Sequence, residues 1–177
     1  MPTAKKRKPA VEHSHIMLKV TNYSIHAGGG INHETLDHRY AHDKTKVFRF
    51  DNAIEIVSLC SWPEERYNNE FLVNIRGQDS GIHNFNSELS DFHVLDKDGC
   101  RKYRKRGNYE IAVYEPPDSI GMIEKVRGQE AWQINAWLPL STTSDLQRLV
   151  TSSQNVYIEI HEVKIGKRRA LRSIQFS

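Results

Sequence analysis

The sequence lacks the features that mark secreted, disulfide-rich and membrane-spanning proteins. It has only two cysteines in 177 residues, and no segment approaches the roughly 18 consecutive apolar residues of a spanning helix. The basic start of the chain is followed by polar residues, where a secretory signal needs an apolar stretch of about 7–15 residues. We therefore expect a cytoplasmic protein, or a nuclear one if the source is a eukaryote or a virus of eukaryotes. We also expect no membrane partner, and Cys60 and Cys100 in the reduced state.

The common motifs of nucleotide binding and hydrolysis are also missing. The triplet Gly28-Gly29-Gly30 is not followed by Lys-Ser or Lys-Thr, so we interpret it as a flexible turn after a strand over residues 16–25. No Gly-x-Ser-x-Gly elbow is present, and Asp79-Ser80-Gly81 lacks the apolar flanks expected around an aspartic-protease carboxylate. These absences lead us to expect no cofactor and to lean against an enzyme.

The chain has the size and composition of one soluble globular domain. It has 177 residues, of which 38% are hydrophobic and 27% charged, values typical of a folded domain. Residues 1–14 are basic and polar with almost no apolar side chains, so we expect a flexible arm there. Residues 15–177 are expected to form a single domain.

Apolar residues recur at every second position through most of this domain, which is the period of β-strands. The segment 47–59 fits one bent strand or two. The alternation changes phase at His161-Glu162, which predicts a β-bulge. The clearest alternating segments are residues 71–75, 111–113, 132–138, 156–165 and 170–176.

Turn and helix signals complete the predicted fold. Asp96-Lys97-Asp98-Gly99 and Gly166-Lys167 are typical of hairpin tips. Thr142, three residues before Asp145, resembles a capping box and predicts one short helix over about residues 143–151. We predict an all-β domain, an antiparallel sandwich or partly open barrel of about seven to nine strands with one short helix.

Histidines supply one candidate metal site. His33, His38 and His42 lie close together in the sequence among several carboxylates, and imidazole with carboxylate suits zinc or iron. A metal-dependent hydrolase is therefore one hypothesis, and a solvated polar loop is the alternative. His13 and His15 are assigned to the solvated arm, and His161-Glu162 either forms a functional pair or only re-aims side chains at the bulge.

The positive charge is segregated along the chain. The net charge is only +3, yet three short runs without any acidic residue hold fourteen of the 25 Lys and Arg residues. Tyr103 lies within the densest run and Tyr109 just after it. The runs consist of Lys5, Lys6, Arg7 and Lys8 in the arm; Arg101, Lys102, Arg104, Lys105 and Arg106; and Lys164, Lys167, Arg168, Arg169 and Arg172.

Such clusters are suited to contact with the phosphates of a polyanion. Guanidinium groups grip phosphate in a bidentate manner, and an aromatic ring among cations stacks on an unpaired base. We therefore predict a non-catalytic binding module that contacts DNA or RNA through these residues, Tyr103 included. Charged hairpin tips also discourage edge-to-edge aggregation, so the alternative is a module for protein–protein assembly within a larger complex.

Overall fold

The computed structural model describes residues 11–31, 48–78, 87–117, 119–128 and 130–177, and it divides the chain into two compact units. The first unit combines Met1–Asp79 with Ser119–Ser177, and the second is the insertion Ser80–Asp118. The sequence predicted a single domain over residues 15–177.

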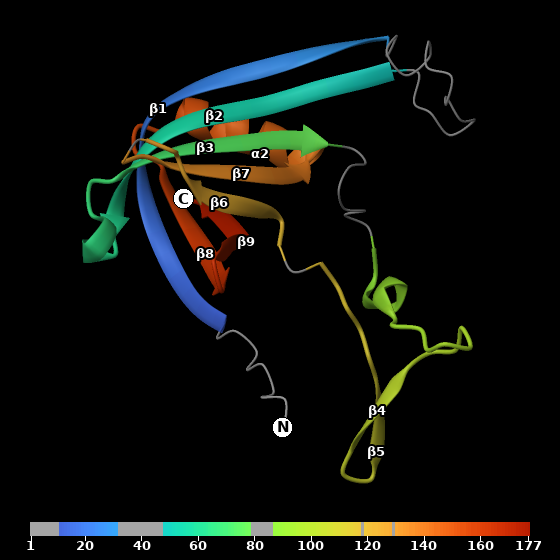
Figure 1. The fold of residues 1–177 in the computed structure, drawn as a ribbon. Helices are drawn as coiled ribbons and strands as arrows, with labels where there is room; N and C mark the ends of the chain where they lie inside the picture. Colours follow the sequence, from blue (N-terminus) through green and yellow to red (C-terminus); the bar gives the residue numbers. More distant parts are fainter. Residues whose placement is uncertain (1–10, 32–47, 79–86, 118, 129) are drawn as a thin grey trace. The chain divides into compact units, whose positions relative to one another are not determined.

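The first unit is a closed barrel of seven strands in the order β1-β2-β3-β7-β6-β9-β8 (Figure 1). Neighbouring strands are antiparallel except for β3 and β7, which are parallel. The closed barrel confirms the all-β prediction, and of the two predicted arrangements it agrees with the barrel. The strands are β1 (Val11–Ile31), β2 (Phe48–Trp62), β3 (Glu70–Gln78), β6 (Gly121–Lys125), β7 (Trp132–Pro139), β8 (Tyr157–Ile165) and β9 (Arg168–Phe176).

The long strand β1 closes the barrel because it pairs with two partners. Residues 11–19 pair with β8 and residues 17–31 pair with β2. Register shifts at Met17/Leu18 and at Val20/Asn22 accompany the change of partner, and such irregularities bend a strand and increase its twist. Only residues 17–19 of β1 pair on both sides, so residues 20–31 have β2 as a strand partner on one side and no strand partner among the described residues on the other.

Three expectations are corrected along β1 and β2. Residues 11–14 belong to the barrel and not to the flexible arm, because Val11 pairs with Ile165. Gly28-Gly29-Gly30 is not a turn but part of the strand, where Gly29 pairs with Phe50. The segment that fitted one strand or two is one continuous strand, β2, which ends before the cis peptide Trp62–Pro63 and the short 3-10 helix η1 (Glu64–Arg66).

The barrel interior is filled by the apolar side of the predicted alternation. On β3 and β7, for example, Phe71, Val73, Ile75 and Ile134 are fully buried, while the residues between them point outward. The same rule on every strand produces one core cluster inside the barrel. The outward side chains are therefore free to be polar, and they build the surfaces described below.

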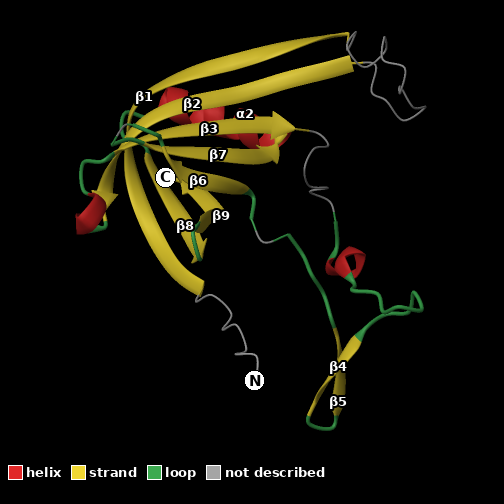
Figure 2. Ribbon diagram, viewed as in Figure 1, coloured by secondary structure: helices red, strands yellow, loops and turns green. Residues whose placement is uncertain are grey.

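The single α-helix described, α2 (Leu140–Ser152), packs against β2, β3 and β7 (Figure 2). Its seat is tight, because a side chain at Gly77 would press on Thr143 and Leu140. The helix was predicted, but its start was placed too late. It begins directly after Pro139, no side chain caps its N-terminus, and Thr142 lies inside it rather than at its cap.

The hairpin β8–β9 confirms two local predictions. Gly166 at its tip has φ of 64°, a left-handed conformation that favours glycine. The register shifts between His161 and Glu162, as the change in alternation predicted. The extra residue is Arg172 on β9, because Ser173 and Leu171 pair with consecutive residues of β8. Glu162 pairs with Ser14 in an unbroken register and shares the inward face of Ile158 and Ile160, where it is fully buried, while His161 stays on the outer surface.

The second unit is a small hairpin structure. It consists of the 3-10 helix η2 (Leu89–Phe92) and the paired strands β4 (Tyr103–Arg106) and β5 (Tyr109–Ala112). The predicted turn at 96–99 is present, with Gly99 at φ of 78° and the Asp96 carboxylate accepting hydrogen bonds from the N–H groups of Asp98 and Cys100. Within the described residues 87–117 no side chain is fully buried.

None of the helices in the described ranges is both long and apolar enough to cross a membrane.

Candidate functional site

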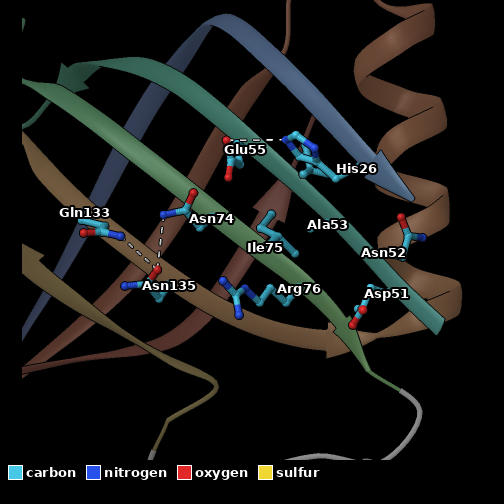
Figure 3. A pocket seen from close by; sticks show the side chains of 12 residues that line it. His26, Asp51, Asn52, Ala53, Glu55, Asn74, Ile75, Arg76, Gln133 and Asn135 are labelled. Carbon is cyan, nitrogen blue, oxygen red and sulfur yellow. Dashed lines mark hydrogen bonds and ion pairs between the residues drawn. The ribbon is translucent and has the colours of Figure 1, made fainter. Parts of the chain in front are cut away.

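The outer faces of β1, β2, β3 and β7 form a polar hollow with a volume of about 540 Å³ (Figure 3). Strand alternation places its side chains outward, because their neighbours Ile54, Ile75 and Ile134 fill the core. Cross-strand register then aligns them in one row. The row runs Ser24, Glu55, Asn74, Asn135 and Met122 across five strands.

Three carboxamides form the centre of this hollow, and we call Asn74, Gln133 and Asn135 the amide cluster. The Asn135 Oδ1 atom accepts two hydrogen bonds of 3.3 Å, one from Asn74 Nδ2 and one from Gln133 Nε2 (Figure 3). All three side chains are only partly exposed. The two bonds fix the orientation of each amide, because an amide can present its oxygen or its nitrogen but not both in one direction.

Charged side chains flank the amide cluster. His26 Nε2 lies 3.6 Å from Glu55 Oε2, and Asp51 on β2 and Arg76 on β3 also line the hollow (Figure 3). A smaller hollow of about 220 Å³ shares Glu55 and Asn74 with the first and adds Tyr23. The outer face thus combines fixed neutral amides, a carboxylate and an exposed aromatic ring.

A second concavity, which we call the basic groove, lies between β6 and the β8–β9 hairpin. It has a volume of about 520 Å³. It opens because β6 pairs with β9 only through Gly121 and Met122, after which the two strands no longer pair. The described residues that line it carry four cations and one acid, namely Lys125, Lys167, Arg168, Arg169 and Glu124, together with Met122, Ile123 and Trp132.

A buried carboxylate organises one wall of the basic groove. Glu162 accepts hydrogen bonds from Arg66 at 2.9 Å and from Ser14 at 3.0 Å, and it also pairs with Arg169. Both guanidinium groups approach the Trp132 ring, with centroid distances of 4.9 Å for Arg66 and 5.1 Å for Arg169. Arginine favours such aromatic contacts.

The arginines keep Glu162 ionised. Burial alone would raise the pKa of this carboxyl group, but the hydrogen bond from Arg169, the charges of Arg66 and Arg169 and the hydrogen bond from Ser14 together outweigh it. The pKa of Glu162 therefore lies below its ordinary value. One buried negative charge faces two positive charges, so the network as a whole stays positive beside the groove.

Three histidines gather on the outer surface of the β1–β8 seam, namely His13 and His15, which lie on β1 and not in the arm, and His161 at the predicted bulge. His13 Nδ1 lies 3.1 Å from His161 Nε2, and the His15 ring stacks on His161 with centroids 4.8 Å apart. Desolvation first, and then the charges of His15, His13 and Arg172, lower the pKa of His161. The nearby Glu159 carboxylate lies 3.6 Å from His15 Nδ1.

The structure places the basic residues of the third run in different surroundings. In the third run, Lys167, Arg168 and Arg169 come together in the basic groove. Lys164 instead pairs with Glu12 at 2.9 Å across the β1–β8 seam, and Arg172 lies near His161. The acids that meet this run are Glu12 on β1, which pairs with Lys164, and Glu162 on β8, which pairs with Arg169.

The second run lies in the other unit. Arg101 forms an isolated bridge with Leu95, and Lys102 follows it. Tyr103, Arg104, Lys105 and Arg106 form β4, where Lys105 pairs with Glu110 on β5. All six residues are exposed. The arm residues Lys5, Lys6, Arg7 and Lys8, and the candidate metal ligands His33, His38 and His42, lie outside the described residues. Within the described ranges no group of three or more His, Cys, Asp or Glu side chains could hold a metal ion.

Several site residues were not predicted from the sequence. Trp132 and Arg66 in the Glu162 network had no local signal, because their partners are remote in the chain. The amide cluster had a partial one, since strand alternation already placed Asn74, Gln133 and Asn135 opposite the apolar face. Their convergence depends on the parallel pairing of β3 with β7.

The fold and these surfaces define a small closed barrel with concave polar and basic areas on its outside. Comparison with protein families, curated proteins and solved structures finds no match for this chain.

Proposed function

We propose that this chain is a binding module that contacts the phosphates of a nucleic acid through the basic groove. The observation that carries the proposal is the convergence of Lys125, Lys167, Arg168 and Arg169 on one hollow whose only acid among the described lining residues is Glu124. Closely spaced cations release counterions when they meet a polyanion, and this release drives phosphate binding.

The Glu162 network supports this assignment. A guanidinium held by a buried carboxylate loses less side-chain freedom when it binds phosphate than a mobile one does. Arg169 is held in this way by Glu162 and by the Trp132 ring. Since Arg66 contributes a second positive charge, Glu162 orients Arg169 without neutralising the groove.

The exposed run on β4 is a second candidate contact. Its cations stand beside Tyr103 and Tyr109, whose exposed fractions are 53% and 76%. Exposed aromatic rings among cations are suited to stacking on unpaired bases.

Salt-dependent binding tests the proposal. Fluorescence anisotropy with labelled single-stranded and duplex oligonucleotides should give affinities that fall steeply as salt rises. The double variant Lys125→Gln/Lys167→Gln should weaken binding and make the log K against log salt slope shallower by about 1.4 on single strands, at about 0.7 per lost phosphate contact.

The matched control is Arg148→Gln, which removes an exposed cation on α2 that is paired with Asp145 at 2.7 Å. This variant should bind like the wild type. An unchanged salt slope in the double variant, or no binding by the wild type to either oligonucleotide, refutes the proposal.

A further inference from the structure

We propose that the amide cluster reads the unpaired bases of a single-stranded nucleic acid whose phosphates lie in the basic groove. This inference rests on the function proposed above and specifies which kind of nucleic acid is bound and where its bases lie.

The amide cluster presents a fixed set of hydrogen-bonding atoms. Both acceptor positions of Asn135 Oδ1 are used by Asn74 and Gln133. Among the described side chains, none bonds to the two N–H donors of Asn135 Nδ2 or to the carboxamide oxygens of Asn74 and Gln133. The hollow therefore presents the two N–H donors of Asn135 between the carboxamide oxygens of Asn74 and Gln133. Neutral amides pair with the donor and acceptor edges of bases.

The charge around the amide cluster argues against phosphate as its own ligand. The three amides are neutral, and the adjoining Glu55 carboxylate would repel an anion. Arg76 is the one Lys or Arg among the described residues that line the hollow, and the carboxylates Asp51 and Glu55 line it as well. A ligand that matches the whole outer face must therefore be neutral at the amides and anionic elsewhere.

The polar hollow and the basic groove are lined by neighbouring strands, since β7 contributes Gln133 and Asn135 to the hollow and its partner β6 lines the groove. Met122 pairs with Asn135, and Glu124 pairs with Gln133. Both β6 residues also line the basic groove. Adjacent strands are separated by about 4.8 Å, so a ligand need only cross one strand to pass from the amides to the cations. A strand with a base and a phosphate in every nucleotide has this arrangement of neutral and charged groups.

Unpaired bases suit this surface better than a duplex does. A protein reads the major groove of a duplex by inserting a helix or a two-stranded ribbon, whereas the amide cluster lies in a hollow on the outer face of the sheet. In a single strand the base edges are free to enter such a hollow. Tyr23, with 40% of its surface exposed in the adjoining hollow, offers a ring for stacking at the far end.

The test compares strands that have bases with a strand that has none. The probes are labelled oligodeoxynucleotides of about 16 nucleotides, the upper limit of the site size of small single-strand-binding folds. They include homopolymers, a matching duplex and an abasic strand of equal length. Wild-type protein should bind at least one homopolymer on the order of ten-fold more tightly than either the abasic strand or the duplex.

The decisive variant is Asn135→Asp. The aspartate carboxylate keeps the acceptor for Asn74 and Gln133 but lacks the two N–H donors of the asparagine. We expect the fold to be preserved, which circular dichroism checks. The matched control is Gln154→Glu, which adds the same charge at an exposed position outside both hollows. Asn135→Asp should abolish the preference for the homopolymer and leave the affinity for the abasic strand close to that of Gln154→Glu.

The possible failures are distinguishable. Equal affinity of the wild type for abasic and base-bearing strands, preference for the duplex, or an unchanged base preference in Asn135→Asp overturns the base-reading role while phosphate binding stands. Absence of binding to every probe overturns the proposed function and this inference together. The variant Lys125→Gln/Lys167→Gln should weaken binding to abasic and base-bearing strands by the same factor.

Discussion

Replacement of Glu162 by glutamine should destabilise the protein more than any single exposed charge substitution. The carboxylate is fully buried, and Arg66 and Arg169 donate to its two oxygens while Ser14 donates to one of them. Glutamine keeps the shape of the side chain but removes the negative charge. Two guanidinium groups, whose side chains are only 16% and 24% exposed, then face each other without their counter-ion.

The expected cost follows from these contacts. Hydrogen bonds to charged groups contribute about 1.5–3 kcal/mol each, and removal of one partner from a buried ion pair costs about 3–5 kcal/mol. We expect a loss of about 3–5 kcal/mol in the free energy of unfolding. That loss is a large fraction of the roughly 5–15 kcal/mol of a typical domain.

Equilibrium urea unfolding measures this loss, with tryptophan fluorescence as the probe because Trp132 lies against both arginines. The control is Glu12→Gln, which breaks the more exposed pair with Lys164 and should cost less than about 1 kcal/mol. If Glu162→Gln costs no more than this control, the carboxylate does not hold the network together and the reasoning fails.

The contribution of Glu162 to the stability of the folded protein should decrease at acid pH. The pKa of Glu162 is lower in the folded protein than in the unfolded chain. Its contribution to stability is therefore fully present above the ordinary glutamate pKa of about 4.3 and is lost as pH falls through the folded value. Glu162→Gln should lose less stability than wild type over this acid range.

Three further outcomes are expected. Gly121→Ala should destabilise the barrel by at least about 2 kcal/mol in urea unfolding, because a Cβ there would overlap the Asn135 carbonyl oxygen; Gly28→Ala, in open space, should change stability by less than about 0.5 kcal/mol. An alkylating reagent should label the exposed Cys100 rapidly and the buried Cys60 slowly in native protein, since burial also raises the pKa of Cys60, with equal labelling in urea. Because the pKa of His161 is lowered, its contribution to stability is present above about pH 6.5 and is lost as pH falls, so His161→Asn should flatten the stability curve as pH falls below about 6.5. Equal thiol rates in native protein, a tolerated Gly121→Ala, or an unaltered pH curve would contradict the respective reasoning.

The strands were predictable because alternation is a local property of the sequence. The apolar side chains of β3, β7 and β8 occupy the core as predicted, and the phase change at His161-Glu162 marks a real register shift. The pairing of strands was not predictable in the same way. The parallel contact of β3 with β7 joins residues more than 60 positions apart, and alternation within a strand does not specify its partner.

Turns were predicted correctly where they require a glycine in the left-handed conformation. Predictions from local sequence were wrong where contacts with distant residues determine the backbone conformation. Gly166 and Gly99 both adopt the left-handed conformation that their turns require. The Gly28-Gly29-Gly30 triplet was predicted as a turn, yet pairing with β2 holds it in an extended strand. Thr142 resembled a helix cap, but α2 begins at Leu140, and Leu140 and Thr143 of its first turn pack on Gly77.

Glu162 should affect phosphate binding in the basic groove either through its negative charge or by orienting Arg169. A purely electrostatic account predicts that Glu162→Gln binds a polyanion more tightly, because the substitution removes a negative charge beside the cations. If Glu162 serves to orient Arg169, the same substitution should weaken phosphate binding although the groove becomes more positive. Anisotropy with the abasic strand, under conditions where circular dichroism shows the variant folded, separates the two accounts. Weaker binding with a less steep salt slope indicates orientation. Tighter binding would mean that Glu162 serves the stability of the barrel alone and opposes the function of the groove.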